Sequence, residues 1–457
     1  MRHYLFLLSF LLPCFGLAQQ DLGTHFMRGI WQANRTNPAL LPDARVVVGL
    51  PGVYNSFYAN GLTYNRVIQP RNGETVLDLD EFVEELEDRN FLKEYLDVET
   101  LSLGLTFGSL HFNLGHTAHA LAFADYPQEL AQFFWQGNAQ FIGQTVDIGL
   151  NGQVKGYHAF AFGFAYQFPE GLTLGLKVKL LNGFGDTSTG KDQDELRLST
   201  SDDVYQLTLD SDFRLNTTGD LQYNGLDDIE YRFAQGSFQV KDLFSSNFGF
   251  AFDLGARYQT ERWDLAFSLI DLGRINWDRD VVNLRIQGEH TFEGLDGVND
   301  LIRDSSVNYG ILDTLETIFA VDSTFETYRT VLPAGLYLSA NYRLSPVFSV
   351  GALFYSEFYR GAAFPAFIVS GQARLSKWFQ GGITYGFRQR SWDNLGLNAA
   401  VSLGPVQIVA STDTFFDLVQ PFDAGNVNFR LGLNLVFNRQ EPEWTENRKR
   451  DQSFFGE

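Results

Sequence analysis

Apolar and polar residues alternate along many stretches of the chain. Between Tyr157 and Phe168, the large aromatic residues Phe160, Phe162 and Phe164 share one face, whereas the opposite face carries Ala, Gly and Gln. A period of two is typical of a β-strand, whose successive side chains point to opposite faces. The same alternation recurs at Leu172–Leu180, Asn247–Tyr258, Trp263–Ile270, Gly335–Arg343, Pro346–Ser356, Leu395–Leu403 and Val427–Phe437. We therefore predict an all-β protein.

The length and chemistry of these segments favour a membrane barrel over a soluble sheet. They run about 8 to 12 residues, whereas strands of soluble sheets average about 5–6 and a tilted transmembrane strand needs about 9–11. One face is strongly apolar, and the other is rich in Gly, Ala, Asn and isolated charges, as a polar lumen is. Aromatic residues lie at strand ends, where interface girdles belong. A large secreted β-sandwich or β-propeller is the alternative.

Lipid offers no water to an open sheet edge, so a membrane sheet must close on itself. The chain is long enough for a transmembrane antiparallel outer-membrane β-barrel of about 14 strands over residues 43–437. Within it, the alternation turns one set of polar and aromatic side chains toward the lumen. The predicted lumen-facing residues are Lys177, Lys179, Asp253, Arg257, Tyr337, Tyr355 and Arg430.

Both ends of the chain differ from the barrel. Arg2 and His3 precede an apolar run that ends in Gly16-Leu17-Ala18, which predicts a signal peptide at residues 1–18, cleaved after Ala18. Cys14, the chain's one cysteine, lies in this leader. Residues 438–457 are polar and charged and are predicted to be a tail beyond the last strand.

The remaining segments are expected to be short helices and loops. Helical spacing of apolar residues predicts an amphipathic helix within 78–96, and Pro127–Trp135 is predicted to be a helix that ends at Gly137. Three stretches, residues 184–193, 211–226 and 288–330, are predicted to be long acidic loops.

The formal net charge of −21 argues against a nucleic-acid partner, because a phosphate backbone attracts clustered Lys and Arg. An acidic surface suits contact with outer-membrane lipid and lipopolysaccharide through divalent cations.

Catalytic and metal-binding motifs are weak. Gly185–Asp192 has the spacing of a phosphate-binding loop, but Asp192 replaces the Ser or Thr that would hold magnesium. On one strand His111 and His119 would face the opposite side from His116, which makes a three-histidine zinc site hard to reach. We therefore predict a non-enzymatic protein with no cofactor and no metal site.

Residues 27–42, from Met27 to Pro42, include the triplet Asn37-Pro38-Ala39. Pro38 pushes Asn37 out of the helical region, and the Asn37 side chain can then bond the backbone two residues on. Together with Tyr126-Pro127 and the closing Asn426–Asn434 segment, this stretch resembles a family of Gram-negative outer-membrane barrels catalogued as a domain of unknown function. That family is similar to FadL-type fatty-acid transporters and to PorV-type barrels of a secretion system.

The resemblance implies that residues 19–42 form an N-terminal hatch inside the lumen, with Asn37, Pro38 and Ala39 as its turn. A surface turn before the first strand is the alternative. It also implies two functions: a FadL-like channel for small hydrophobic or amphipathic molecules, or a PorV-like barrel that docks a secretion-system protein. An outer-membrane enzyme is a third and weaker hypothesis.

Overall fold

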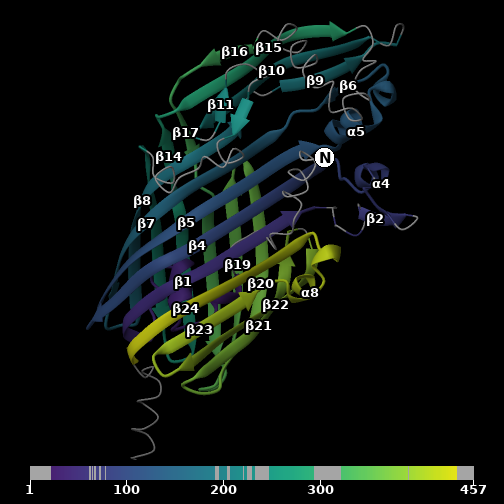
Figure 1. The fold of residues 1–457 in the computed structure, drawn as a ribbon. Helices are drawn as coiled ribbons and strands as arrows, with labels where there is room; N and C mark the ends of the chain where they lie inside the picture. The colour runs from purple at the N-terminus through teal and green to yellow at the C-terminus, as the bar shows by residue number, and fades with distance from the viewer. Residues whose placement is uncertain are drawn as a thin grey trace, which may run out of the picture.

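A computed structural model describes residues 22–60, 63, 65, 68–71, 74–77, 79–190, 195–202, 206–219, 221–223, 229–231, 246–292, 321–389 and 391–439. The predicted leader and nearly all of the predicted tail lie outside these residues. The described part of the chain builds a closed antiparallel ring of fourteen strands (Figure 1). Closure follows from β1, which pairs with β24 on one side and with β4 on the other. The all-β barrel prediction and its strand number are confirmed.

The ring strands follow one another around the barrel in chain order. They are β1 (Ala44–Ala59), β4 (Arg89–Phe107), β5 (Leu110–Pro127), β7 (Asn151–Gln167), β8 (Leu172–Thr189), β13 (Asn247–Gln259), β14 (Trp263–Trp277), β18 (Ala334–Arg343), β19 (Phe348–Tyr359), β20 (Ala362–Arg374), β21 (Phe379–Arg388), β22 (Ser391–Leu403), β23 (Val406–Thr412) and β24 (Asn426–Arg439).

The two faces of the ring differ as a membrane barrel requires. Phe162 is 50 % exposed, Phe250 55 % and Leu338 55 %, and these side chains point outward. Polar side chains of the ring strands, including Asn113 of β5 and Ser339 of β18, are buried on the inner face. An exposed apolar belt around a closed barrel is stable in lipid and costly in water, so the chain is an outer-membrane β-barrel. No helix among the described residues is long and apolar enough to cross a bilayer.

The two ends of the barrel are unlike each other. At one end, tight turns such as Gly108-Ser109 and Gly404-Pro405 join the strands, and β1 begins and β24 ends there. We call this the short-turn end. At the opposite end, which we call the loop end, four connections are much longer, between β1 and β4, β5 and β7, β8 and β13, and β14 and β18.

Beyond the loop end, additional strands extend one side of the wall upward (Figure 1). They are β6 (Thr145–Asp147), β9 (Glu195–Thr200), β10 (Leu207–Thr218), β15 (Val281–Phe292), β16 (Val321–Thr324) and β17 (Tyr328–Val331). β10 pairs with β15 along its whole length and with the end of β8. A small core of Phe141, Ile148, Leu198 and Leu207 fixes this extension.

The extension corrects the prediction of long loops. Residues 184–189 belong to β8, 211–218 to β10, and most of the described parts of 288–330 to β15, β16 and β17. These residues are polar because the extension lies beyond the lipid, so they lack the apolar alternation that marks the strands of the ring. The rest of the three predicted loops lies partly outside the described residues.

The helices are short. α5 (Gln128–Gln136) begins after Pro127 and ends at Gly137, whose φ is 80°, so this prediction is confirmed. The helix predicted within 78–96 is only partly correct: α4 covers Leu79–Glu84, and residues from Arg89 on belong to β4 because they pair with β1 and β5. The remaining elements are α2 (Leu22–His25), η1 (Trp31–Arg35), η2 (Ala139–Phe141), α8 (Phe415–Val419), η4 (Pro421–Asp423), and two small hairpins, β2 (Ile68–Arg71) with β3 (Glu74–Leu77) and β11 (Leu221–Tyr223) with β12 (Ile229–Tyr231).

Candidate functional site: the segment inside the barrel and its two cavities

Residues 22–42, called the N-terminal segment below, lie inside the ring of strands. Their hydrogen bonds reach the wall on every side: Gln32 bonds Asn434 of β24, Arg35 bonds Thr117 of β5, and Ser268 of β14 donates to the Thr36 carbonyl. Most residues of the segment are buried, including Leu22, Met27 and Leu40. The segment therefore occupies the lumen rather than the outer surface.

The first turn of the segment is held at the loop end of β23. The backbone N–H groups of Leu22 and Gly23 donate to the two carboxylate oxygens of Asp413, each at 2.8 Å. Arg388 donates to the same carboxylate at 3.0 Å, and both side chains are almost completely buried. The hydroxyl oxygens of Thr24 and Ser411 lie 3.1 Å apart. A buried charge with these partners is satisfied in place, so the contact fixes the start of the segment.

The Asn37-Pro38-Ala39 triplet forms a tight turn against β13 and β14. Asn37 Oδ1 accepts from the Ala39 N–H at 2.8 Å, and the Leu40 N–H donates to the Asn37 carbonyl at 2.9 Å. Asn37 Nδ2 donates to the backbone carbonyls of Ala256 and Phe267 at 3.3 and 3.0 Å. One side chain thus closes the turn and joins it to the wall.

Two glycines leave room for this turn. A Cβ on Gly255 of β13 would lie 2.1 Å from Asn37 Oδ1, and a Cβ on Gly175 of β8 would lie 2.5 Å from the Pro38 carbonyl carbon. A Cβ essentially never lies this close to a non-bonded heavy atom, so any larger residue at either position would displace the turn. The small residues on the inner face are a seat for the segment.

An aromatic cluster packs against the loop-end half of the segment. The His25 ring stacks on Tyr337 with centroids 5.4 Å apart, and Tyr337 contacts Tyr355 at 4.7 Å. Leu22, Phe26 and Leu353 complete a buried cluster with these rings. His25 Nδ1 lies 2.8 Å from Thr36 Oγ1 and Nε2 lies 2.8 Å from Ser339 Oγ, so both ring nitrogens are engaged.

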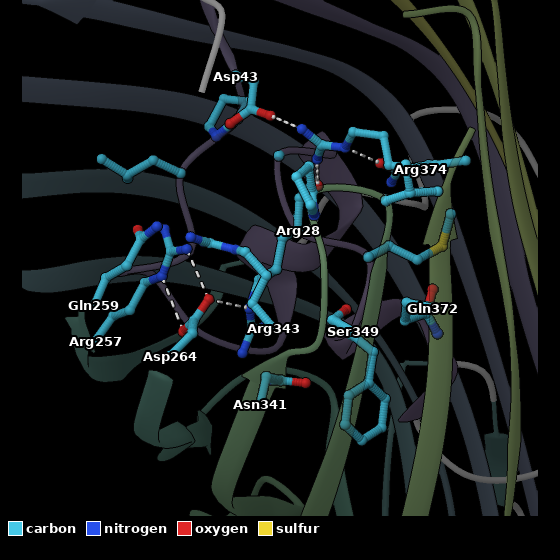
Figure 2. A pocket seen from close by; sticks show the side chains of 18 of the residues that line it. Arg28, Asp43, Arg257, Gln259, Asp264, Asn341, Arg343, Ser349, Gln372 and Arg374 are labelled. Carbon is cyan, nitrogen blue, oxygen red and sulfur yellow. Dashed lines mark hydrogen bonds and ion pairs between the residues drawn. The ribbon is translucent and has the colours of Figure 1, made fainter. Parts of the chain in front are cut away.

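On the short-turn side of the segment lies a cavity of about 240 Å³, called the vestibule (Figure 2). Its charged lining, among the described residues, consists of Arg28, Arg257, Arg262, Arg343, Arg374, Asp43 and Asp264. Arg28 and Arg257 both bond Asp264, at 2.9 and 2.8 Å. Arg374 bonds Asp43 at 2.7 Å and also donates to the Arg28 carbonyl, so it attaches the segment to β20.

On the loop side of the segment lies a second cavity of about 120 Å³, called the inner chamber. Arg35 bonds Asp97 and Glu99 at 3.4 and 3.2 Å, and His119 bonds Asp97 at 2.6 Å. Lys179 lies between Asp253 and Asp271, at 2.9 and 2.7 Å. The rings of Tyr54, Tyr95 and Tyr157 also line this cavity. Its lining is therefore polar, charged and aromatic rather than aliphatic.

The lumen-facing set proposed from the sequence falls on both sides of the segment. Lys177 donates to the Asn34 carbonyl, and Lys177, Lys179, Asp253 and Arg430 line the inner chamber. Arg257 lines the vestibule. Tyr337 and Tyr355 belong to the aromatic cluster instead of either cavity.

The alternation of apolar and polar residues did not predict the charged partners that complete the two cavities. Arg28 lies in the N-terminal segment, where no period applies, and its partner Asp264 is 236 positions away. Asp97 and Glu99 are both in β4, on the inner face, but nothing in their spacing identifies Arg35 as the partner. The alternation along a strand shows which face of the sheet a side chain lies on. It does not show which charged residue, distant in the sequence, that side chain pairs with.

The three histidines of β5 are separated. His111 lies 2.9 Å from Thr106 Oγ1, His119 bonds Asp97, and His116 lies 3.0 Å from His158. Within the described residues, no group of three or more His, Cys, Asp or Glu side chains is placed to hold a metal ion. Gly185–Thr189 of the phosphate-loop-like motif is the end of strand β8, whereas such a loop must open a helix.

Several solved outer-membrane proteins are similar in fold to this chain. The Ralstonia pickettii toluene transporter TbuX is 10% identical, with a TM-score of 0.42 over 90% of this chain and 94% of that one. A Pseudomonas aeruginosa FadL homologue is 12% identical, with a TM-score of 0.40 over 92% of this chain and 100% of that one. Neither comparison bears on what this chain carries. No curated protein matches it.

The model of one protein family matches residues 38–413, from Pro38 in the N-terminal turn to Asp413, whose carboxylate holds the start of the segment. This span includes the β13–β14 wall beneath the turn and most of the lining of both cavities. The chain therefore belongs to the family of unknown function DUF5723.

Proposed function

We propose that this protein is an outer-membrane channel for small amphipathic molecules, and that the N-terminal segment is the hatch that closes it. The observation that carries the proposal is the position of the two cavities, which lie on opposite sides of the same segment inside one barrel. Displacing the segment would join them into one passage. In bacterial barrels the short turns face the periplasm, so the vestibule would open there and the inner chamber toward the outside.

The lining of the cavities supports an amphipathic cargo better than a purely apolar one. Tyrosine rings in the inner chamber offer flat apolar faces, and the ion pairs beside them offer hydrogen-bonding groups. An aliphatic molecule would have to cross this polar region without replacing any of its hydrogen bonds, which is unfavourable. The sequence predicted a channel for small hydrophobic or amphipathic molecules. Of these two classes, our proposal keeps the amphipathic molecules, which have a polar head.

The docking alternative loses part of its basis. A docking barrel would need long free loops, and most of the described portions of residues 211–226 and 288–330 are paired strands instead. No observation among the described residues favours a protein partner over a small molecule.

A reversible tether tests the hatch. Thr24 and Ser411 have hydroxyl oxygens 3.1 Å apart, so thiols at these positions, T24C with S411C, are close enough to form a disulfide. In planar bilayers we expect the oxidised protein to be locked at low conductance and the reduced protein to open. Thr208 and Thr291 make a matched control, because their hydroxyls are also 3.1 Å apart but lie in the β10–β15 extension.

The outcomes are distinct. Oxidation of T208C with T291C should leave conductance unchanged. A second variant that lacks residues 22–41 should conduct continuously, because nothing then separates the two cavities. Equal conductance in the tethered, reduced and shortened proteins would overturn the proposal.

A further inference from the structure

The vestibule is cationic within a strongly acidic protein. The whole chain carries a formal net charge of −21. In the vestibule, by contrast, five arginines face only two carboxylates among the described residues. The acidic composition of the chain does not account for a positively charged cavity. A cleft lined by charges of one sign raises the local concentration of ions of the opposite sign.

The two carboxylates are already engaged. Asp264 accepts from Arg28 and from Arg257, and Asp43 accepts from Arg374. Arg262 donates to the neutral hydroxyl of Tyr342 at 3.1 Å, and Arg343 donates to the backbone carbonyl of Glu261. The acids of the vestibule therefore hold its arginines in place without matching them in number.

Hydrogen-bond donors without acceptors line the same cavity. Arg28 Nη2, Asn341 Nδ2 and Gln380 Nε2 are all buried, and none has a partner among the described residues. All three residues line the vestibule, and Arg28 and Asn341 are seen around it in Figure 2. Buried donors left unpaired are costly, and here each of the three unpaired atoms is a donor.

We propose that the vestibule is a binding site for an oxyanion, a carboxylate or a phosphate group. Guanidinium groups offer paired N–H donors that match the two oxygens of such a group, and the amides of Asn341 and Gln380 would supply further donors. The cavity of about 240 Å³ is large enough for a small free anion or for the charged head of an amphipathic molecule. Both sources present the same chemistry to the site.

The proposal depends on the vestibule and not on the movement of the N-terminal segment. A closed barrel that never conducts could still bind an anion here. Conversely, a conducting barrel could lack this site, so the binding experiment and the conductance experiment can fail separately.

Calorimetry on the full chain in a neutral detergent tests the site. The probes are inorganic phosphate, acetate and octanoate, with octanol as the uncharged control. The variants are Arg28→Gln and Arg343→Gln, each of which removes one charge from the vestibule. Arg439→Gln is the matched control, because Arg439 lies at the same end of the barrel and bonds the Lys377 and Gly404 carbonyls outside the vestibule.

We expect one anion to bind per barrel, octanol not to bind, and each vestibule variant to weaken anion binding by about tenfold, as a lost charge-assisted hydrogen bond does. Octanoate binding much tighter than acetate assigns the site to the head of an amphipathic molecule, and phosphate binding tightest assigns it to a free anion. Arg343→Gln keeps the test valid if Arg28→Gln disturbs the segment. No anion binding, or equal binding by wild type and both vestibule variants, would overturn the proposal.

Discussion

The vestibule and the inner chamber lie on opposite sides of one segment, yet their charges are arranged differently. Among the residues that the structure describes, five arginines of the vestibule share two carboxylates, and three buried donors there have no acceptor. In the inner chamber Lys177, Lys179, Arg35 and Arg430 are matched in number by Asp97, Asp253, Asp271 and Glu357. A balanced set of buried charges leaves no charge in the wall uncompensated, whereas a cavity with a surplus of one sign attracts a counter-ion. The comparison separates a cavity whose charges are balanced from the cavity that we propose as an anion site.

Removing one cationic side chain should therefore lower the free energy of unfolding more in the inner chamber than in the vestibule. Lys179→Met leaves the carboxylates of Asp253 and Asp271 close together, with Asp253 only 1 % exposed. We expect it to lower the free energy of unfolding by about 3–5 kcal/mol, as breaking a buried ion pair does. Arg343→Gln leaves Asp264 and Asp43 with the arginines that bond them, and we expect it to cost less than about 1 kcal/mol. Urea midpoints in detergent micelles measure both, and similar losses would remove the distinction.

A methyl group on the wall should disturb the boundary between the cavities. Gly255→Ala places a Cβ 2.1 Å from Asn37 Oδ1, so the Asn37-Pro38 turn must move at a cost of about 1–3 kcal/mol. Limited proteolysis should then cleave the N-terminal segment faster, and single-channel openings should become more frequent. Gly115→Ala is the matched control, because its Cβ would meet only the Ser102 Cβ, at an ordinary 3.4 Å. Unchanged proteolysis of Gly255→Ala would mean that the turn does not depend on its seat.

A smaller effect is expected from pH, because His25 lies in the segment between the two cavities. Burial lowers the pKa of His25 well below its ordinary value, and the positive charge of Arg28 lowers it further, while Asp264 opposes them weakly. His25 would therefore bind a proton more readily when the segment is displaced than when it is in place in the lumen. Seating is therefore unaffected above the ordinary pKa of about 6.5 and weakens as the pH falls below it, by at most about 1.4 kcal/mol per pH unit.

Channel openings that become more frequent between pH 6.5 and 5 would show this dependence. His25→Gln keeps a hydrogen-bonding side chain but does not titrate, so its opening frequency should stay flat over the same range. The same pH response in the variant would assign the effect to another group.

The barrel was predictable because lipid imposes a simple pattern. Phe160, Phe162 and Phe164 must face hydrocarbon, so the period of two survives wherever a strand crosses the membrane. Residues 211–218 also belong to a strand, the 12-residue β10, but this strand lies beyond the lipid, so no apolar alternation is required of it. β15 also lies beyond the lipid and lacks the alternation, so this part of the chain was predicted to be a loop.

The site was predictable only in part. The Asx-type turn at Asn37 follows from local chemistry, since the side chain bonds a backbone N–H two residues on. The arginines of the vestibule come from the N-terminal segment, β13, the β13–β14 turn, β18 and β20, and their meeting depends on closure of the whole ring. Inward parity placed Arg257 in the lumen but could not place Arg28 beside it.

The bonds of the N-terminal segment also constrain how the chain assembles. Gln32 bonds Asn434 across 402 positions, and Leu22 bonds Asp413 across 391. Contacts of such sequence separation form late, after the strands that carry them. The segment directly precedes β1, and β1 closes the ring by pairing with β24, the last strand of the chain. Ring closure and the placement of the segment in the lumen therefore both depend on β24. A chain stalled before β24 pairs has an open edge and an unseated segment together, which makes exposure of residues 22–42 to protease a direct reporter of incomplete assembly.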